Sequence, residues 1–336
     1  MKRRRHDATR SLGYCGHMRH RTTKEALRAV RGTRVLVVGD VMLDVYIRGI
    51  SERLSPEASV PVIEVGQTEE YIGGAGNAAA NAAALGAQVT LVGVVGNDSQ
   101  ARTVRRIARA AGVRTAFVVD PKRPTTQKTR VTSHGKHVAR LDREHRTSLP
   151  RRTEKEIIRT IRALPKPDMV IVSDYGKSVI SAAVVSVLKK KCGVRVIVAD
   201  VKPARMHLFR GVRAIKLNLP EASAILGAKR ARRAGAARAL SQKFSSSIVL
   251  TKGANGTDLY ERADGKRAHL PARTKTKEVR DVSGAGDTVT AVLACMLAAG
   301  ADFAHAVEAA NQAGGLAVAR HGTAAVSTAD ILRSMA

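Results

Sequence analysis

The residues best suited to chemistry lie at 281–288, in the order Asp-Val-Ser-Gly-Ala-Gly-Asp-Thr. Two glycines around a small residue let the backbone turn its N–H groups toward one point. An apolar helix follows at once, and its N-terminal amides add positive potential there. Such an anion hole suits a phosphoryl group in transfer, because the charge spreads over its oxygens. Asp287 is expected to stay ionised beside the hole and to accept a proton from a substrate hydroxyl. In the alternative interpretation, Gly284 and Gly286 only form a tight turn and Asp287 caps the helix.

The sequence that must position residues 281–288 alternates β-branched runs with Ala-rich helical stretches. This alternation predicts an α/β fold, namely a doubly wound, mostly parallel sheet with helices on both faces. The clearest segments are strands over 34–39, 169–173 and 247–252 and helices over 151–163, 219–226, 231–243 and 285–299.

Two stretches depart from the alternation. Residues of about 45–65 and 117–141 have the pattern of hairpins, and we interpret them as a small β-lid over one end of the sheet. Residues 1–31 are basic and lack apolar periodicity, which predicts a disordered tail before a domain that covers residues 32–336. A transit peptide and an overextended start are the alternatives for this tail.

The formal net charge of +30 would attract nucleic acid or anionic small molecules. Lys and Arg are spread along the whole chain, without interleaved aromatic residues or helix-turn-helix or finger spacing, so nucleic acid is not expected as the main partner. The three cysteines are widely separated, which fits the reducing cytoplasm. No apolar run approaches the ~18 residues of a transmembrane helix, so no membrane span is expected.

The string at 281–288 resembles the C-terminal signature of the ribokinase-like (PfkB-type) carbohydrate kinases. Further segments match that family in its order between about residues 33 and 332, and they lie at 38–44, 54–58, 73–81, 173–177 and 218–221. Two of them, Ser-Pro-Glu-Ala at 55–58 and Ser-Asp-Tyr-Gly-Lys at 173–177, are similar to the kinases of D-glycero-β-D-manno-heptose 7-phosphate.

The resemblance implies an ATP- and Mg²⁺-dependent kinase that converts this sugar phosphate to the 1,7-bisphosphate in the synthesis of ADP-heptose for the lipopolysaccharide core. A ribokinase-like kinase for another sugar or nucleoside is one alternative. A non-catalytic, nucleic-acid-associated protein on a kinase fold is the other. Dependence on a monovalent cation and dimerisation through the lid, both found among relatives, stay open. No H-x-G-H nucleotidyltransferase string is present, so the adenylyltransferase of bifunctional relatives is not expected.

The resemblance also assigns roles to residues. Asp287 is similar to the catalytic base, and the anion hole corresponds to Gly284, Ala285 and Gly286. The residues implied to bind the sugar or its phosphate are Asp44, Gly73, Gly74, Asn77, Arg130, Arg140, Lys177 and Lys202. Each has a structural alternative: a turn cap for the aspartate, packing for the glycines at a helix start, and a solvated surface for each cation.

The nucleotide side is implied to involve Asn218, Glu221, Thr251, Gly253, Gly256 and Asn311, with Glu221 also at the magnesium ion. The alternatives are a helix capping box at 218–221, a β-turn at 251–256 and helix packing for the last asparagine. The sequence departs from the family where Asp-Pro-Lys is replaced by Asp-Val-Lys at 200–202 and Thr-Pro-Asn by Lys-Leu-Asn at 216–218. These departures put the geometry of both loops in question.

Overall fold

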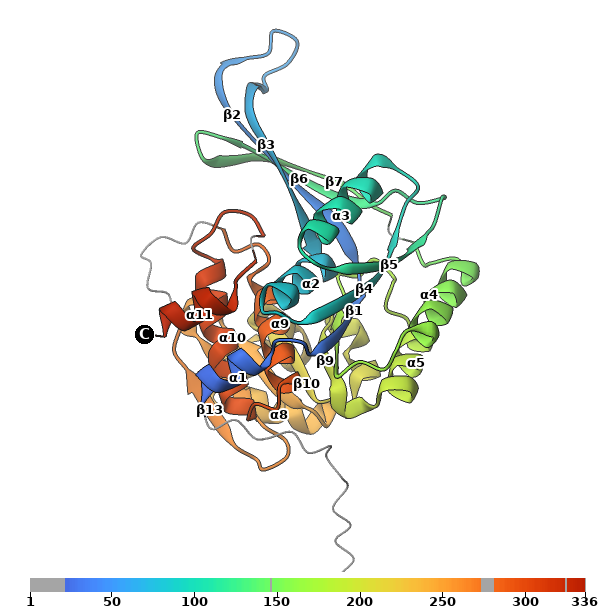
Figure 1. The fold of residues 1–336 in the computed structure, drawn as a ribbon. Helices are drawn as coiled ribbons and strands as arrows, with labels where there is room; N and C mark the ends of the chain where they lie inside the picture. The colour runs from blue at the N-terminus through green and yellow to red at the C-terminus, as the bar shows by residue number, and fades with distance from the viewer. Residues whose placement is uncertain (1–21, 146, 273–280, 324, 336) are drawn as a thin grey trace, which may run out of the picture.

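The β-branched runs form one nine-stranded sheet in the computed structural model, which describes residues 22–145, 147–272, 281–323 and 325–335 (Figure 1). The strand order is β13-β12-β11-β10-β9-β8-β1-β4-β5. Neighbours from β11 to β5 run parallel, whereas β12 and β13 are antiparallel at one edge. The bounds are β1 Arg34–Gly39, β4 Gln88–Val95, β5 Arg114–Val119, β8 Met169–Ser173, β9 Ile197–Asp200, β10 Ala214–Asn218, β11 Ser247–Thr251, β12 Thr257–Tyr260 and β13 Arg267–Leu270.

Helices cover both faces of this sheet, because successive side chains of a strand point to opposite sides. In β1, Val35 and Val37 enter one core, whereas Leu36 and Val38 enter the other. The first core is closed by α1 Thr23–Ala29, α2 Ala75–Ala84, α3 Ser99–Ala110, α9 Ala285–Ala298, α10 Phe303–Ala317 and α11 Thr328–Ser334. The second is closed by α4 Arg151–Ala163, α5 Ala182–Cys192, α6 Leu219–Leu226, α7 Ala228–Arg232 and α8 Ala236–Phe244. The predicted doubly wound α/β fold is confirmed.

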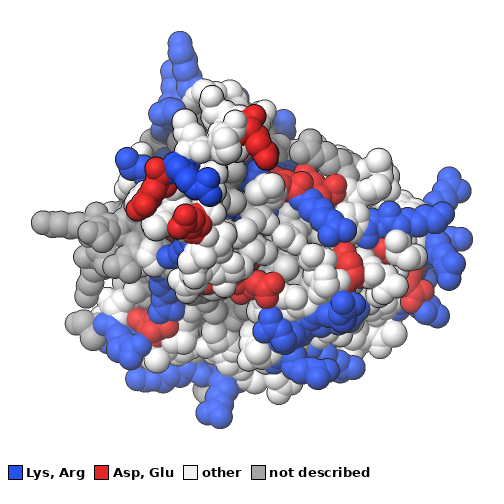
Figure 2. Space-filling model, turned by 90° about the horizontal axis from the view of Figure 1, so that it is seen from above, with Lys and Arg blue, Asp and Glu red and all other residues white. Residues whose placement is uncertain are grey.

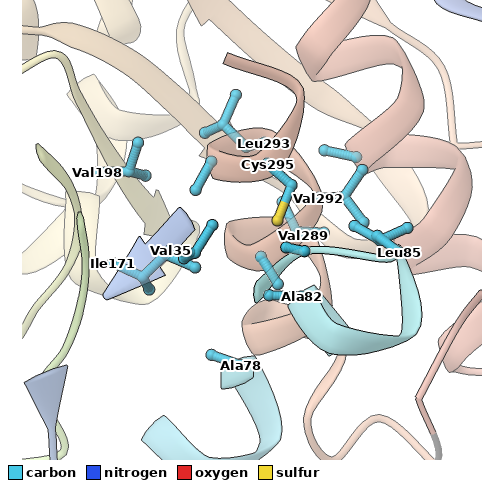
Figure 3. Packing of buried hydrophobic residues seen from close by; sticks show 14 of the residues in the cluster. Val35, Ala78, Ala82, Leu85, Ile171, Val198, Val289, Val292, Leu293 and Cys295 are labelled. Atoms are coloured by element: carbon cyan, nitrogen blue, oxygen red, sulfur yellow. The ribbon is translucent and has the colours of Figure 1, made fainter. Parts of the chain in front are cut away.

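Helix α9 lies at the centre of the first core. Its residues Val289, Val292 and Cys295 pack beside Ala78 and Ala82 of α2, as Figure 3 shows. The alanines keep the two helices close, because a small side chain leaves room for the facing helix. Since α9 is buried along nearly its whole length, the core fixes the position of its first turn.

A second sheet of four strands projects from the end of the first, at the top of Figure 1. Its order is β3-β2-β6-β7, with bounds β2 Val41–Leu54, β3 Pro61–Gly74, β6 Thr126–Ser133 and β7 Lys136–Arg143. We call this sheet the lid. Its strands overlap the segments expected at 45–65 and 117–141, but residues 117–119 belong to β5 of the main sheet, because they pair in parallel with β4.

The N-terminal tail is shorter than the sequence predicted. Thr22 and Glu25 form a reciprocal capping box that starts α1. Ala26, Leu27 and Val30 are fully buried in the first core. A disordered tail over residues 1–31 is therefore wrong for residues 22–31, and residues 1–21 lie outside the described residues.

Other differences are local. The helix expected over 231–243 is divided into α7 and α8, because Gly235 adopts a left-handed conformation with φ 93°. Strands β12 and β13 and helix α11 were not predicted. Short 3-10 helices, η1 Val194–Val196, η2 Pro203–Phe209 and η3 Gly253–Asn255, complete the fold. Within the described ranges, no helix has both the length and the apolar character needed to cross a bilayer.

Candidate active site

The turn that starts α9 brings two predicted segments together. Gly284 is the N-cap of the helix, with φ 77°, a conformation that favours glycine. A Cβ atom built there would lie 2.4 Å from Asn77 Nδ2, so a larger residue would collide with α2. Asn77 Nδ2 donates a 3.1 Å hydrogen bond to the carbonyl oxygen of Gly284. The glycine turn and the start of α2 therefore form one unit.

Asp287 lies in the first turn of α9, and only 2% of it is exposed. Its Oδ2 accepts a 3.1 Å hydrogen bond from Asn77 Nδ2, and its Oδ1 accepts one of 2.8 Å from the hydroxyl of Tyr175. The carboxylate is thus held from two sides, by α2 and by the loop after β8. Fixed orientation is what a positioned proton acceptor needs.

Burial raises the pKa of Asp287 to about 7, and repulsion from Asp200 adds to that rise. Hydrogen bonds from Asn77 and Tyr175 and the charge of Lys216 act in the opposite direction. The expectation that this carboxylate simply stays ionised is therefore corrected, because it titrates near neutral pH. A general base is most effective with its pKa near the working pH, so the shift suits the predicted role.

The loop that carries Tyr175 is held by a buried carboxylate at the end of β1. Asp40 accepts backbone N–H groups from Tyr175 at 2.7 Å, Lys177 at 2.9 Å and Val179 at 3.2 Å. Burial raises the pKa of Asp40 to about 6, although these donors lower it. Two adjacent parallel strands thus meet at their carboxyl ends, the usual place for a ligand in such sheets.

Three residues predicted to bind the sugar, Asp44, Gly73 and Arg130, are in contact at the base of the lid. A Cβ atom on Gly73 would come within 2.0 Å of Asp44 Oδ2, and one on Gly74, at φ 58°, within 2.4 Å of the carbonyl oxygen of Asp40. Arg130 Nη1 lies 2.7 Å from Asp44 Oδ1. Burial raises the pKa of Asp44, against the effect of this guanidinium. The glycines therefore let backbone and carboxylate approach each other closely.

The cations predicted to face a sugar phosphate are distributed unevenly. Lys177 Nζ lies 2.5 Å from Glu144 Oε2, in a largely buried pair. Arg140 stands opposite Arg130 across β6 and β7, but its side chain is 60% exposed and pairs with Asp142. Arg130 therefore contacts Asp44 at the site, whereas Arg140 lies on the same face of the lid but on its edge strand β7, where it is exposed. On the face shown in Figure 2, Lys and Arg are spread around the rim with Asp and Glu among them.

On the nucleotide side, Asn218 and Glu221 form a reciprocal capping box at the start of α6. Glu221 Oε1 also accepts a 3.1 Å hydrogen bond from Lys202, whose Nζ lies 5.7 Å from the centre of the Tyr175 ring. Lys202 thus stands between the nucleotide side and the Asp287 cluster, not under the lid. The capping box uses only Oε2 of Glu221. It therefore does not exclude a role of Glu221 Oε1 and Lys202 at the phosphates.

A cavity of about 400 Å³ lies beside these residues, lined by Leu219, Arg232, Lys252, Ala254, Asn255, His269, Pro271 and Ala272. Thr251, Gly253 and Gly256 belong to the strand end and turn next to Ala254 and Asn255. Asn311 Nδ2 donates a 2.8 Å hydrogen bond to the carbonyl oxygen of Pro271. Thr251, Gly253, Gly256 and Asn311 thus lie next to lining residues of this hollow, although none of them is itself a lining residue.

Among the described residues, no group of three or more His, Cys, Asp or Glu is arranged to bind a metal ion. The single carboxylate of Glu221 still fits Mg²⁺, which often binds through one or two carboxylates and the phosphates of a substrate. Of the two oxygens of Glu221, Oε2 accepts the backbone N–H of Asn218 and Oε1 accepts the ammonium group of Lys202, so a magnesium ion at Oε1 would share that oxygen with Lys202.

Several residues of the site received no role from the sequence. Tyr175 lies within the Ser-Asp-Tyr-Gly-Lys segment, which signalled it by resemblance alone. Lys216 marked a departure from the family and proves to be buried beside Gly286. Tyr46 carried no signal, because its partner Asp281 is distant in sequence.

Comparisons with known proteins agree with this geometry. Residues 32–330 match the pfkB family carbohydrate kinases. Bifunctional protein HldE from Rhodopseudomonas palustris (strain BisB5) is 41% identical over 323 residues, which are 92% of this chain and 64% of that protein. The chain therefore spans less than two thirds of that relative's length.

Two solved structures share the fold. Phosphofructokinase-2 from Escherichia coli, in complex with potassium, has a TM-score of 0.75 at 16% identity, covering 90% of this chain and 97% of that one. Ribokinase from Cryptococcus neoformans var. grubii serotype A, in complex with ADP, has a TM-score of 0.67 at 20% identity, covering 90% and 99%. Since the family match extends over most of the sequence, the chain belongs to the pfkB family of carbohydrate kinases.

Proposed function

We propose that this chain transfers the γ-phosphoryl group of ATP to the anomeric hydroxyl of D-glycero-β-D-manno-heptose 7-phosphate, giving the 1,7-bisphosphate and ADP for the synthesis of ADP-heptose and the lipopolysaccharide core. The observation that carries the proposal is Asp287, a buried carboxylate with its pKa near 7 beside the glycine turn of α9. The resemblance of the segments at 55–58 and 173–177 and the identity to bifunctional protein HldE support the acceptor.

In this mechanism Asp287 accepts the proton of the acceptor hydroxyl as that oxygen attacks the γ-phosphorus. A new P–O bond forms, the bond from the γ-phosphorus to its bridging oxygen breaks, and ADP leaves with the electron pair. Asn77 and Tyr175 hold the carboxylate in place. The backbone amides at 284–286 point toward the transferred group, whose charge they stabilise.

The two substrates are proposed to bind on opposite sides of Asp287. Asp44, the glycines at 73–74 and Arg130 take the sugar at the base of the lid, where Lys177 is also placed near Glu144. ATP occupies the hollow beside residues 251–256, Asn218 and Asn311. Magnesium, held by the nucleotide phosphates and Glu221, would neutralise charge on those phosphates. A monovalent cation is a further proposed cofactor, since phosphofructokinase-2 from Escherichia coli was solved with potassium.

The test is the release of ADP by the purified chain with a panel of acceptors: heptose 7-phosphate, fructose 6-phosphate and ribose, each in Na⁺ and in K⁺. We expect kcat/KM to be highest for heptose 7-phosphate, by at least about 100-fold. An equal or higher kcat/KM with another acceptor would reject the heptose assignment. It would still support the assignment of the chain as a sugar kinase. No turnover, together with steeply salt-dependent binding of DNA or RNA, would support the nucleic-acid-associated alternative.

We also propose that a second copy of the chain covers the lid. Most large apolar side chains that are exposed in the described residues lie on its strands or their connection, and these are Ile50, Leu54, Val60, Val65, Val138 and Leu141. Exposed apolar groups gathered on one element are typical of an interface. The proposed location is the cytoplasm, since Cys192 and Cys295 are free and buried thiols, as a reducing compartment allows.

A further inference from the structure

A buried lysine stands directly beneath the glycine turn of α9. Lys216, on β10, has a side chain that is only 5% exposed. A Cβ atom on Gly286 would come within 2.7 Å of Lys216 Nζ, so the ammonium group occupies the space that a side chain at position 286 would take. Position 286 can therefore hold no residue larger than glycine while the lysine stays in place.

The ammonium group is kept charged by its surroundings. Lys216 Nζ lies 2.8 Å from Asp200 Oδ2, which also accepts a 3.0 Å hydrogen bond from Thr290 Oγ1. Although burial acts against the charge, Asp200 most strongly, then Glu221 and Asp287, raise the pKa of Lys216 above its usual value. The desolvation of so enclosed a lysine is offset here by its pairing with Asp200.

The ammonium group lies between a counter-ion and the glycine turn. Asp200 on β9 pairs with it, and the backbone of Gly286 lies against it, while the carboxylate of Asp287 is close enough to raise the pKa of Lys216. The groups that face Asp287 itself are Asn77 from α2, Tyr175 from the loop after β8, Asp200 from β9 and Lys216 from β10. Lys216 is the one cation among them.

We propose that Lys216 is a positioning residue for phosphoryl transfer, which supplies a fixed positive charge behind the amides of residues 284–286 and beside Asp287. The inference rests on the function proposed above for that turn. The charge strengthens the attraction of the amides for the transferred phosphoryl group and favours the ionised base. Because Nζ is already held by Asp200, it needs no reorganisation during the reaction.

The test compares Lys216→Met with the double variant Lys216→Met/Asp200→Asn, in which the ion pair is replaced by two neutral groups. Arg213→Met/Glu261→Gln is the matched control, because it removes a similarly enclosed ion pair, at 3.3 Å, away from Asp287. For each protein we would measure Tm, kcat, KM and the pH dependence of kcat.

We expect Lys216→Met to lower kcat on the order of 100-fold, as the loss of one charge-stabilising group does in other enzymes. The acid limb of its pH profile of kcat should move to higher pH. The double variant should regain most of the lost Tm and place the acid limb at or below that of the wild type, since Asp200 opposes Lys216 at Asp287. Its kcat should stay low, whereas the control should lose Tm but not kcat.

Recovery of wild-type kcat in the double variant would overturn the proposal, because the pair would then serve stability alone. A Lys216→Met variant with unchanged kcat and acid limb would also overturn it. Full activity of Asp287→Asn would instead overturn the proposed function, so the two failures are distinguishable.

Discussion

The hydroxyl of Tyr46, on lid strand β2, donates a 2.9 Å hydrogen bond to Asp281 Oδ2, at the start of the segment that leads into α9. Asp281 Oδ1 in turn accepts the backbone N–H of Ser283 at 2.8 Å. The lid and the glycine turn are thus joined through one carboxylate. Arg130, which contacts Asp44, also stacks 5.1 Å from the centre of the Tyr46 ring. A sugar bound under the lid would therefore act on residues that contact the glycine turn proposed to hold the transferred phosphoryl group.

We predict that Tyr46→Phe lowers kcat roughly 10-fold, because it removes a hydrogen bond to a charged group that is worth about 1.5–3 kcal/mol. The ring packing is kept, so Tm should fall by only the few degrees that correspond to one lost hydrogen bond. Steady-state kinetics and thermal unfolding measure both effects. Tyr260→Phe, on the distant strand β12, is the control and should match the wild type. Equal kcat in both variants would show that the lid does not position the turn.

The pKa of Asp287 predicts the pH dependence of the reaction. Because the base must be ionised, kcat should rise with pH and level off above about 7. The same shift affects stability: folding raises this pKa from 3.8 to about 7, so the folded state binds the proton more tightly. The stabilisation is complete below pH 3.8 and is lost as pH rises through about 7.

Asp287→Asn removes this titration. Denaturant unfolding at pH 5 and pH 8 should show a larger loss of unfolding free energy for the wild type than for Asp287→Asn between these two values. A difference of about 1–3 kcal/mol is expected for a buried carboxyl group. If both proteins lost the same free energy, the carboxylate would have to titrate far from neutral pH.

The two arginines of the lid are predicted to differ. Arg130→Met should raise KM for the sugar phosphate by about 10- to 100-fold, because it leaves Asp44 as an unpaired, largely buried charge. Arg140→Met should change KM less than about 3-fold, since that side chain is exposed and surface pairs contribute little. Initial rates over a range of acceptor concentrations test this. The reverse order would place the phosphate at the outer part of the lid.

The proposed association through the lid can be tested by placing charged residues on the exposed apolar surface of the lid. Leu54 and Leu141 are 62% and 58% exposed, and Leu54→Glu/Leu141→Glu should convert a dimer to a monomer in sedimentation experiments. Unfolding of the monomer should be nearly unchanged, because neither side chain is buried in the single chain. Val282→Glu, at an exposed apolar residue outside the lid, serves as control. A wild-type chain that is monomeric at all concentrations would contradict the proposed interface.

The fold could be predicted from the sequence where local patterns are strong. The bounds of α4, α6 and β8 agree with the prediction, because each has a local signal: apolar periodicity in α4, a capping box at the start of α6 and a continuous apolar run in β8. The tail was mispredicted since the burial of Leu27 depends on α10 and α11, which follow late in the chain. The first lid segment was expected only over 45–65, whereas β2 begins at Val41 and β3 continues to Gly74.

The site was predictable in its motifs but not in its contacts. Asp287 and Asn77 were each found through a local string, yet their hydrogen bond spans 210 positions. The shift in the pKa of Asp287 could not be foreseen, because it results from burial and from Asp200 on another strand. Lys202 was placed with the sugar, whereas its contact with Glu221 places it nearer the nucleotide hollow.

The most direct test is the turnover of Asp287→Asn with ATP, Mg²⁺ and heptose 7-phosphate. Asparagine has nearly the same shape and remains within reach of Tyr175, so folding should survive, which the Tm would show. Loss of the base should lower kcat by about 10²–10⁴-fold, the range typical of general base catalysis. A folded Asp287→Asn variant with kcat within a few-fold of the wild type would contradict the assignment of this carboxylate as the catalytic base.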